Sequence, residues 1–571
     1  IICEICGCFS LINSRSYVFN HTHHQTDRNA DMGFTTIDYS ILFIYLIGVT
    51  AFGSWLGRHQ KSTRDYFLGS RNLPWGAVCF SVVATETSTL TFISIPGLAY
   101  ISNLNFLQLT IGYFIGRVLI SFIFLPAYYK GELSTAYEYL GNRYGMRIRK
   151  FSSIVFQLTR LLADGVRLFA TAIPLSVITG WSFQFSIAVI GIFTIFYTYI
   201  GGIRAVVWID VIQMVIYLGG AIIAGFYLLN HLPGGWSDVT AAALPENKLQ
   251  FINFGFDNSL RDFFTINYTF ITSILGGMFL SMASHGTDQL IVQRLLTCNN
   301  LRDSQKALIT SGVLVFFQFA LFLIIGLMMY AFYQGQAIGP DSAFLTRSDQ
   351  LFPKFIVEVL PSGLSGIIIA GVFAAAMSTL SGSLNSLASS SMLDLYKSRF
   401  GRHNTEDKDL VISRLFTAVW GVVFIGGAML FTDMDHPVVE LGLSIASFTY
   451  GGLLGVFLMG VFFKNVSENA AIIAQWSAIY FMTWIIGISG MAQYVIIGLS
   501  FIAFMWIFFN THSKKEQLVL VVLFIIISWL LRTVEPLRFG WPWYVFIGCV
   551  FTILIGVILT YARMNFRKTK R

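Results

Sequence analysis

The chain has 571 residues, of which 55% are hydrophobic and only 12% are charged, and its mean hydropathy is +0.68. Soluble domains carry about 25% charged residues, so this composition excludes a soluble globular protein and indicates a polytopic membrane protein. The net charge of +8 does not point to nucleic acid, because Lys and Arg in a membrane protein mark its cytoplasmic loops.

Residues 1–31 differ in character from the rest of the chain. They hold six potential metal ligands, but they precede Met32 and the first apolar run and lack the basic, apolar and cleavage-site order of a signal peptide. We expect them to be a non-native upstream extension, with metal binding as a minor alternative. The six side chains are Cys3, Cys6, Cys8, His21, His23 and His24.

The apolar runs predict fifteen membrane spans, since a span needs about 20 mostly apolar residues. The predicted spans are 36–57, 77–100, 103–128, 151–179, 183–200, 205–230, 266–292, 307–333, 362–394, 411–431, 438–462, 469–489, 491–510, 518–532 and 543–561.

The distribution of Lys and Arg between the loops predicts the orientation of the chain. With the N-terminus outside, the inner loops and the C-terminal tail hold about 25 Lys or Arg, against about six in the outer loops. We therefore expect a multi-pass plasma-membrane protein with a cytoplasmic C-terminus, for which the lipid bilayer is one partner. The longest loop leaves no room for a catalytic domain, and we find no phosphate loop, metalloprotease motif or serine elbow. The chain is therefore not predicted to be an enzyme.

The stretch VVATETSTLTF (82–92) places a carboxylate, Glu86, and five hydroxyls inside an apolar run. The Ile-Pro-Gly sequence that follows, at 95–97, loosens the helix. A break here would expose carbonyl oxygens to a hard cation such as Na⁺. Hydroxyls that bond to their own helix are the structural alternative.

Two further spans carry charges. RLLADGVRLFATA places Arg160, Asp164 and Arg167 on one helical face, either as a self-neutralising ladder or with one arginine left for a substrate anion. SMASHGTDQLIVQR (281–294) contains His285, a packing residue or a gating or proton-coupling group.

The stretch AAAMSTLSGSLNSLASSS (374–391) is rich in small residues that permit close helix packing. Ser378, Ser381 and Asn385 recur at helical spacing, so one face of this helix is polar. Its hydroxyls are candidates to complete a sodium site. Broken helices around a polar midplane site are typical of secondary transporters.

Four segments together resemble the sodium:solute symporter family, which includes sodium/glucose, sodium/iodide and sialic acid carriers. They are STRDYFLGSRNLPWGAV (62–78), YIGGIRAVVWIDVIQ (199–213), DQLIVQRLL (288–296) and STLSGSLNSLASSSMLDLYK (378–397).

The resemblance implies an all-α, LeuT-like fold with two inverted five-helix repeats and about 13–15 spans. The first repeat would be 77–230 and the second 266–462. An entry segment at 32–76, an extracellular loop at 231–265 and peripheral spans with a basic tail at 463–571 complete the predicted organisation.

The resemblance also implies a sodium site made from two segments. Its members would be Ala84, Thr87, Ala375, Ser378 and Thr379. A second sodium or release site would use Asp210 and Ser381, but Gly382 stands where the sialic acid carrier has a serine, so we expect that site to be weakened or absent.

The predicted solute pocket departs from that of the sugar carriers, with fewer amides and a buried acid. Its members would be Glu86, Ser88, Thr91, Arg160, Arg167, Ser284 and His285. We expect Glu86 to face Arg160 or Arg167 in the empty state, because an unpaired buried carboxylate is costly.

We therefore predict a sodium-coupled symporter that imports a small organic anion, such as a carboxylate or an acidic sugar. Sodium is its co-transported ion, and no other cofactor and no nucleic acid partner is expected. The alternatives are a proton-coupled or sodium-independent carrier and a sodium/neutral sugar symporter. The sequence leaves the oligomeric state open.

Overall fold

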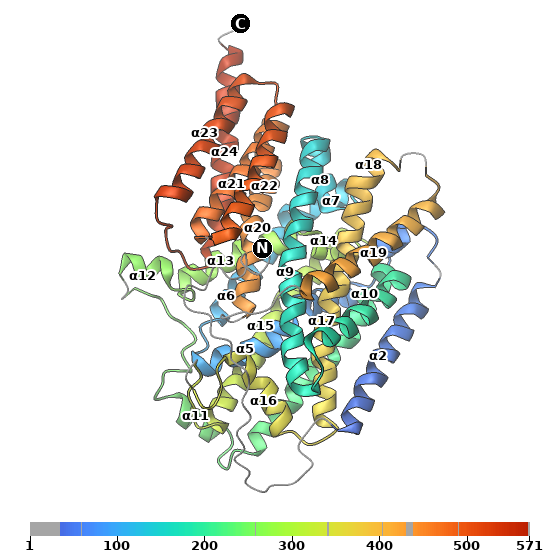
Figure 1. Ribbon diagram of the computed structural model, residues 1–571, viewed down its shortest axis with the longest axis vertical. Helices are drawn as coiled ribbons and strands as arrows, with labels where there is room; N and C mark the ends of the chain where they lie inside the picture. The colour runs from blue at the N-terminus through green and yellow to red at the C-terminus, as the bar shows by residue number, and fades with distance from the viewer. Residues whose placement is uncertain are drawn as a thin grey trace.

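The computed structural model describes residues 35–58, 60–256, 259–339, 342–401, 404–429, 438–488 and 490–568, so the expectation for residues 1–31 lies outside the described residues. Within these ranges the regular structure is helical, apart from two isolated bridges (Figure 1). The helices are α2 (Thr36–Gly57), α3 (Thr63–Leu68), η1 (Gly69–Arg71), α4 (Trp75–Glu86), α5 (Thr89–Ile101), α6 (Leu107–Ile123), α7 (Leu125–Lys130), α8 (Ala136–Arg143), α9 (Met146–Thr179), α10 (Phe183–Asn230), α11 (Trp236–Ala243), α12 (Leu260–Thr265), α13 (Phe270–Gly286), α14 (Gln289–Leu295), α15 (Leu301–Phe332), η2 (Ser348–Gln350), α16 (Leu351–Glu358), α17 (Leu364–Ser390), the π-helical η3 (Ser391–Tyr396), α18 (Lys397–Arg399), α19 (Glu406–Met429), α20 (Val438–Phe462), α21 (Glu468–Ile486), α22 (Gly490–Asn510), α23 (Lys514–Thr533) and α24 (Trp543–Lys568).

Helix α10 is folded back on itself at Gly202, whose φ of 53° and ψ of −158° are not helical. On one side of this residue the Tyr197 hydroxyl donates to the Met377 carbonyl (3.0 Å), and on the other Asp210 accepts from Ser378 (2.7 Å). A straight helix would separate Tyr197 from Asp210 by about 20 Å, yet both contact adjacent residues of α17. The helix therefore makes two crossings, as the sequence predicts.

Twelve of the described helices are long and apolar enough to cross a membrane, or thirteen if the bent pair α4–α5 counts as one span. This set treats α10 as one helix and omits α9, which has 34 residues and carries three charged side chains in its middle. With α9 and the second half of α10 included, the described helices provide the fifteen crossings predicted from the sequence. The all-helical membrane fold is confirmed.

Two spans are interrupted in the middle. Helices α4 and α5 meet at an angle of 60° across Thr87 and Ser88. Helices α13 and α14 are separated by the two residues Thr287 and Asp288. Each pair opens one of the two predicted repeats, so equivalent positions in the two halves carry a break.

Helix α17 lies in the interior, and 89% of its most apolar window is buried. Close backbone contacts join it to α10 and join other helices of the bundle to one another. A Cβ atom added at Gly371 would lie 3.1 Å from the backbone of Tyr217 in α10, and one at Gly277 of α13 would lie 2.4 Å from the Leu109 carbonyl of α6. Small residues permit this approach, which is how membrane helices gain packing energy without a hydrophobic driving force.

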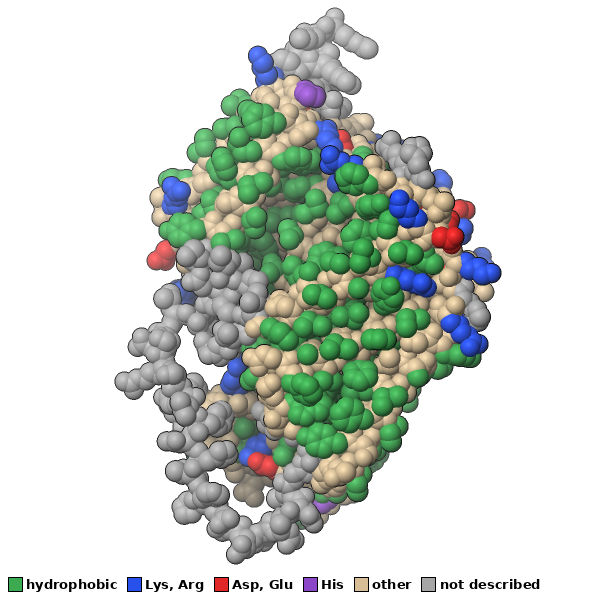
Figure 2. All heavy atoms as spheres, turned by 45° about the vertical axis from the view of Figure 1, so that its right-hand side comes forward, with side chains coloured by type: hydrophobic (Ala, Val, Ile, Leu, Met, Phe, Trp, Pro, Cys, Tyr) green, Lys and Arg blue, Asp and Glu red, His purple; other side chains and the backbone are tan. Residues whose placement is uncertain are grey.

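The two ends of the bundle differ in the loops they carry. Helices α8 and α18, which belong to loops predicted to face inward, lie toward one end, whereas α11 and α16, from loops predicted to face outward, lie toward the other (Figure 1). On the face shown in Figure 2, hydrophobic side chains cover a broad band, and Lys and Arg side chains gather along its edges. This pattern suits a lipid-facing surface with charged groups at the membrane boundaries.

Candidate functional site

The break between α4 and α5 releases backbone carbonyl groups. The Ser88 amide would continue the helix by donating to the Ala84 carbonyl, but it donates to the Glu86 carbonyl instead (3.0 Å). The Thr87 hydroxyl donates to the Val83 carbonyl (2.9 Å) and accepts from a side-chain amide of α15. The expected loosening of this segment is therefore present, and part of its hydroxyl set bonds back to its own helix, as the structural alternative required.

Helix α17 lies directly against this break. The Thr379 hydroxyl lies 3.5 Å from the Thr85 carbonyl and 3.3 Å from the Ala375 carbonyl. Nearer the N-terminus of α17, the Val372 carbonyl accepts a hydrogen bond from the Thr89 hydroxyl (3.2 Å). The two segments predicted to share a sodium ion are therefore neighbours. All five predicted ligands are buried: Ala84, Thr87, Ala375, Ser378 and Thr379.

Asp210 already has a cation beside it. Its carboxylate accepts from the hydroxyls of Ser81 (2.5 Å) and Ser378 (2.7 Å) and pairs with Arg294 (3.1 Å). The Ser381 hydroxyl donates to the carbonyl of Ser378 (3.0 Å). A Cβ atom at Gly382 would lie 2.4 Å from the Arg294 guanidinium, so the glycine leaves room for this arginine to reach Asp210.

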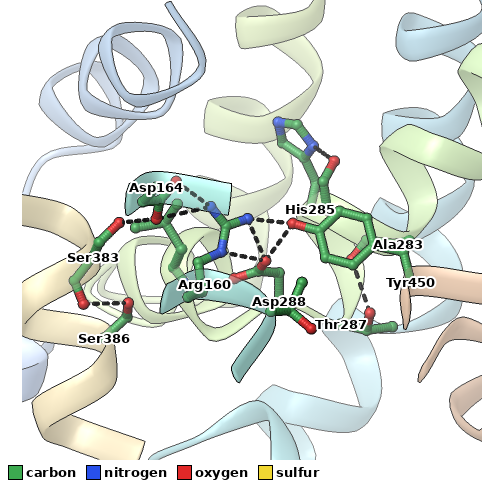
Figure 3. Close-up of polar contacts among 12 residues, drawn as sticks. Arg160, Asp164, Ala283, His285, Thr287, Asp288, Ser383, Ser386 and Tyr450 are labelled. Atoms are coloured by element: carbon green, nitrogen blue, oxygen red, sulfur yellow. Dashed lines mark hydrogen bonds and ion pairs between the residues drawn. The ribbon is translucent and has the colours of Figure 1, made fainter. Parts of the chain in front are cut away.

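The predicted charge ladder on α9 extends across the bundle (Figure 3). Arg160 donates to Asp288 at 2.5 and 2.9 Å and to Asp164 at 3.3 Å, and it also contacts the Tyr450 hydroxyl. Arg167 donates to Asp164 at 2.8 Å. All three guanidinium nitrogens of Arg160 donate hydrogen bonds. Only Nη1 of Arg167 donates in this network, and the Arg167 side chain is 19% exposed.

Glu86 pairs with Arg117 of α6, not with Arg160 or Arg167 as expected. Arg117 is fully buried and also donates to the Ser311 hydroxyl (2.7 Å). The sequence analysis missed this residue, although a lone arginine inside the predicted span 103–128 requires a partner.

One cavity of about 90 Å³ brings the charged groups together. It is lined by all seven residues predicted to bind the solute, Glu86, Ser88, Thr91, Arg160, Arg167, Ser284 and His285, and additionally by Phe106, Tyr113, Phe319 and Tyr450. A small second cavity is lined by Ser88, Asp164, Arg167 and Thr379, among others, and so connects the solute residues with a predicted sodium ligand. The roles of these residues stay predictions.

Comparison with known proteins assigns the chain to a family. Residues 66–478 match the model of the sodium:solute symporter family. The chain is a member of this family. It is 30% identical over 457 residues to the sodium/sialic acid symporter NanT of Aliivibrio fischeri, covering 79% of this chain and 88% of the relative. It is 28% identical over 459 residues to the human sodium/iodide cotransporter, covering 78% of this chain and 69% of the relative.

A solved structure agrees with this assignment. The substrate-bound, outward-open state of a Na⁺-coupled sialic acid symporter superposes with a TM-score of 0.75 at 25% identity, over 93% of this chain and 98% of that one. As a sodium:solute symporter, the protein is a multi-pass membrane carrier with a LeuT-like fold, and not an enzyme. Among the described residues no cluster of His, Cys, Asp and Glu could hold a metal ion.

Proposed function

We propose that the protein imports a small organic anion together with sodium by alternating access. The relatives named above are sodium-coupled symporters, and several further relatives are monocarboxylate transporters. The observation that carries the proposal is the position of Arg167, which lines both cavities and keeps part of its guanidinium free.

The charges around the solute cavity support an anion that enters together with a cation. Among the described residues of this region, three carboxylates face three arginines, so the fixed charges cancel. They are Glu86, Asp164, Asp288, Arg117, Arg160 and Arg167. A buried net charge is costly, so an anion at Arg167 is best accommodated with Na⁺ bound beside it.

We propose that the sodium ion binds between the α4–α5 break and α17, at the five residues predicted from the sequence. A cation there raises the potential at the neighbouring Asp164–Arg167 pair and favours the anion. We further propose that Asp210 and Ser381 do not hold a second sodium ion, because Arg294 already supplies the positive charge at that carboxylate.

We propose that the N-terminus lies outside and the C-terminus in the cytoplasm of a plasma-membrane protein. Two loops rich in Lys and Arg, 129–150 and 395–410, carry α8 and α18, which lie toward the same end of the bundle and support this orientation (Figure 1). One sodium ion that crosses about 100 mV releases roughly 2.3 kcal/mol, enough for some fifty-fold accumulation of solute.

A thermal-shift screen on purified protein tests the proposal. Small organic anions, neutral sugars and amino acids are each added in NaCl and in KCl, because a ligand of the native state raises apparent stability by mass action. We expect hits among the anions, in NaCl only. Equal hits in both salts would refute sodium coupling, and a pH-dependent, sodium-independent hit would assign the coupling to protons. Hits confined to neutral sugars would refute the proposal that the solute is an anion.

Replacement of Arg167 tests the anion contact directly. We expect Arg167→Ala to weaken binding of the anion identified in the screen by at least about ten-fold, since a charge-assisted hydrogen bond contributes about 1.5–3 kcal/mol. Arg167→Lys keeps the charge and should lose less. Unchanged anion affinity in Arg167→Ala would remove this residue from the site.

A further inference from the structure

A separate cavity of about 420 Å³ lies at the end of the bundle that we assign to the cytoplasm. Its wall includes residues of α8 and α18, which lie toward this end (Figure 1). It shares no lining residue with the solute cavity or with the small second cavity. It is therefore a different site from the one that we assign to the transported solute.

Four cationic side chains line this cavity, and two of them are already compensated. Arg149 pairs with the buried Asp394 at 2.8 Å, and Lys397 pairs with the buried Asp409 at 2.9 Å. The other two cations have no carboxylate partner among the described residues. They are Arg64 and Arg71.

Two carboxylates also line the cavity, and neither pairs with these arginines. Glu138 accepts from the Ser134 amide (2.8 Å) and lies in the first turn of α8, where the helix dipole favours a negative charge. Glu132 is exposed, and water screens a charge in that position. The positive charge of Arg64 and Arg71 is therefore available to a ligand.

The backbone around Arg71 is held in an unfavourable conformation. Gly69, Ser70 and Arg71 have φ angles of 55°, 56° and 54°, and this left-handed region is costly for the serine and the arginine. The Ser70 hydroxyl bonds to the Asp65 carboxylate, which fixes the turn. Such strain persists where the surrounding structure imposes it, and it is common at binding sites.

The guanidinium of Arg71 has a donor to spare. Its Nη2 atom donates to the Leu133 carbonyl (2.7 Å), whereas its Nε atom is buried without a hydrogen-bond partner. Buried donors are normally satisfied, so this nitrogen indicates an acceptor in the cavity. Guanidinium groups present a planar fork that matches the oxygens of a carboxylate or a phosphate.

The cavity lies between the inner ends of the two helices that we assign to the sodium ion. Arg71 precedes α4, which begins at Trp75, whereas Leu393 and Lys397 follow α17. An anion that contacts both walls holds these ends together. Alternating access rocks one part of such a bundle against the other, so a ligand of this kind opposes the movement.

We propose that this cavity binds a phosphate-bearing or carboxylate-bearing anion from the cytoplasm at Arg64 and Arg71, and that the bound anion slows transport. The binding stands apart from the proposed function, whereas the effect on transport rests on it. The anion is either a cytoplasmic metabolite or the transported solute after its release, since both offer the same oxygens.

Protection from a thiol reagent tests the binding. Ser398→Cys places a thiol in the cavity wall, in purified protein that also carries Cys3→Ser, Cys6→Ser and Cys8→Ser. Inorganic phosphate, succinate and the transported anion are each compared with chloride at constant ionic strength. We expect phosphate or succinate to slow the labelling in proportion to its occupancy of the site. Labelling of Ser237→Cys, at the opposite end, should not change.

Two variants locate the site. Arg71→Gln and Arg64→Gln should each raise the anion concentration needed for half-maximal protection by at least about ten-fold, because each removes a charge-assisted hydrogen bond. Arg64 is exposed and has no partner among the described residues, so its replacement keeps the test valid if Arg71→Gln fails to fold. Lys130→Gln is the matched control, because Lys130 is an exposed cation of the same loop outside the cavity.

Uptake into proteoliposomes tests the effect on transport. The vesicles contain phosphate, succinate or the transported anion, and sodium-dependent uptake of the anion identified in the screen is followed. Internal phosphate or succinate should slow the initial uptake, and Arg64→Gln should make uptake less sensitive to it. Protection and slowing by the transported anion alone would identify the ligand as the released solute.

The remaining outcomes overturn separate parts of the inference. Labelling that none of the three anions slows would refute the site. Protection that survives both arginine variants would refute its assignment to Arg64 and Arg71. Protection without slower uptake would refute the effect on transport. Uptake that is equal with and without sodium would refute the proposed function and leave the binding result in place.

Discussion

Arg117 shows what single residues contribute that sequence motifs do not reveal. It lies in α6, outside the four motifs that indicated the family, and it compensates the acid at the α4–α5 break. The sequence does indicate that Glu86 needs a positive partner. The identity of that partner depends on how α6 packs against α4, which periodicity cannot supply.

Removal of Arg117 should destabilise the protein strongly. Arg117→Ala leaves the Glu86 carboxylate buried without compensation, and breaking a buried ion pair in this way costs about 3–5 kcal/mol. The double variant Arg117→Ala/Glu86→Ala should be more stable than Arg117→Ala alone. Denaturant unfolding in detergent measures both.

An exposed ion pair provides the control for this measurement. Lys354 and Glu358 form an i,i+4 pair at 2.7 Å on α16, with side chains 26% and 49% exposed. Lys354→Ala should cost less than about 0.5 kcal/mol. A similar cost at Lys354 and Arg117 would contradict the assigned role of the buried pair.

A substitution at Gly382 tests the ion pair between Arg294 and Asp210. Gly382→Ala places a methyl group 2.4 Å from the Arg294 guanidinium, which must then withdraw from the carboxylate. We expect a loss of about 1–3 kcal/mol in stability and an altered sodium dependence of uptake, because Asp210 loses its fixed cation. Gly48→Ala, with no atom within 4 Å of the added Cβ, is the control. Wild-type stability and sodium response in Gly382→Ala would contradict the tight contact.

At the scale of elements, the interruptions decide the architecture. The sequence places TETSTLT in a span, and the structure breaks that span at Thr87 and Ser88 with a 60° bend. The counterpart break at Thr287 and Asp288 was not predicted, although SMASHGTDQ contains a glycine, a threonine and an aspartate in succession. Both breaks face the interior, the only part of a membrane protein where unwound backbone finds partners.

The turn at Gly202 gives a sharp test of the α10 hairpin. Its positive φ favours glycine, and a Cβ atom there would lie 2.5 Å from the Tyr66 carbonyl. We expect Gly202→Ala to lower the yield of monodisperse protein and its melting temperature. Gly219→Ala, on the same helix with open space around the added Cβ, should behave as wild type. Equal behaviour of the two variants would contradict a turn that requires glycine.

At the scale of the whole molecule, the orientation is open to direct measurement. Ser398→Cys lies at the end that we assign to the cytoplasm, and Ser237→Cys lies at the opposite end. In intact cells a membrane-impermeant thiol reagent should label Ser237→Cys, whereas Ser398→Cys should be labelled only after permeabilisation. Among the described residues the native cysteines Cys79, Cys298 and Cys549 are buried, and Cys3, Cys6 and Cys8 are replaced by serine in the background used for labelling. The reverse pattern would invert the topology.

The sequence alone determined the membrane class, because apolar length is a local property of the chain, and four sequence motifs indicated the family. It also named seven residues that line the cavity, from polar groups inside apolar spans and from the family resemblance, and their roles stay predictions. Only the tertiary structure decided the pairings: Glu86 with Arg117, Arg160 with Asp288, and Asp210 with Arg294. Each pair joins different elements of the bundle, so the packing of those elements determines which charge meets which. The spacing of residues along one helix carries no information about that choice.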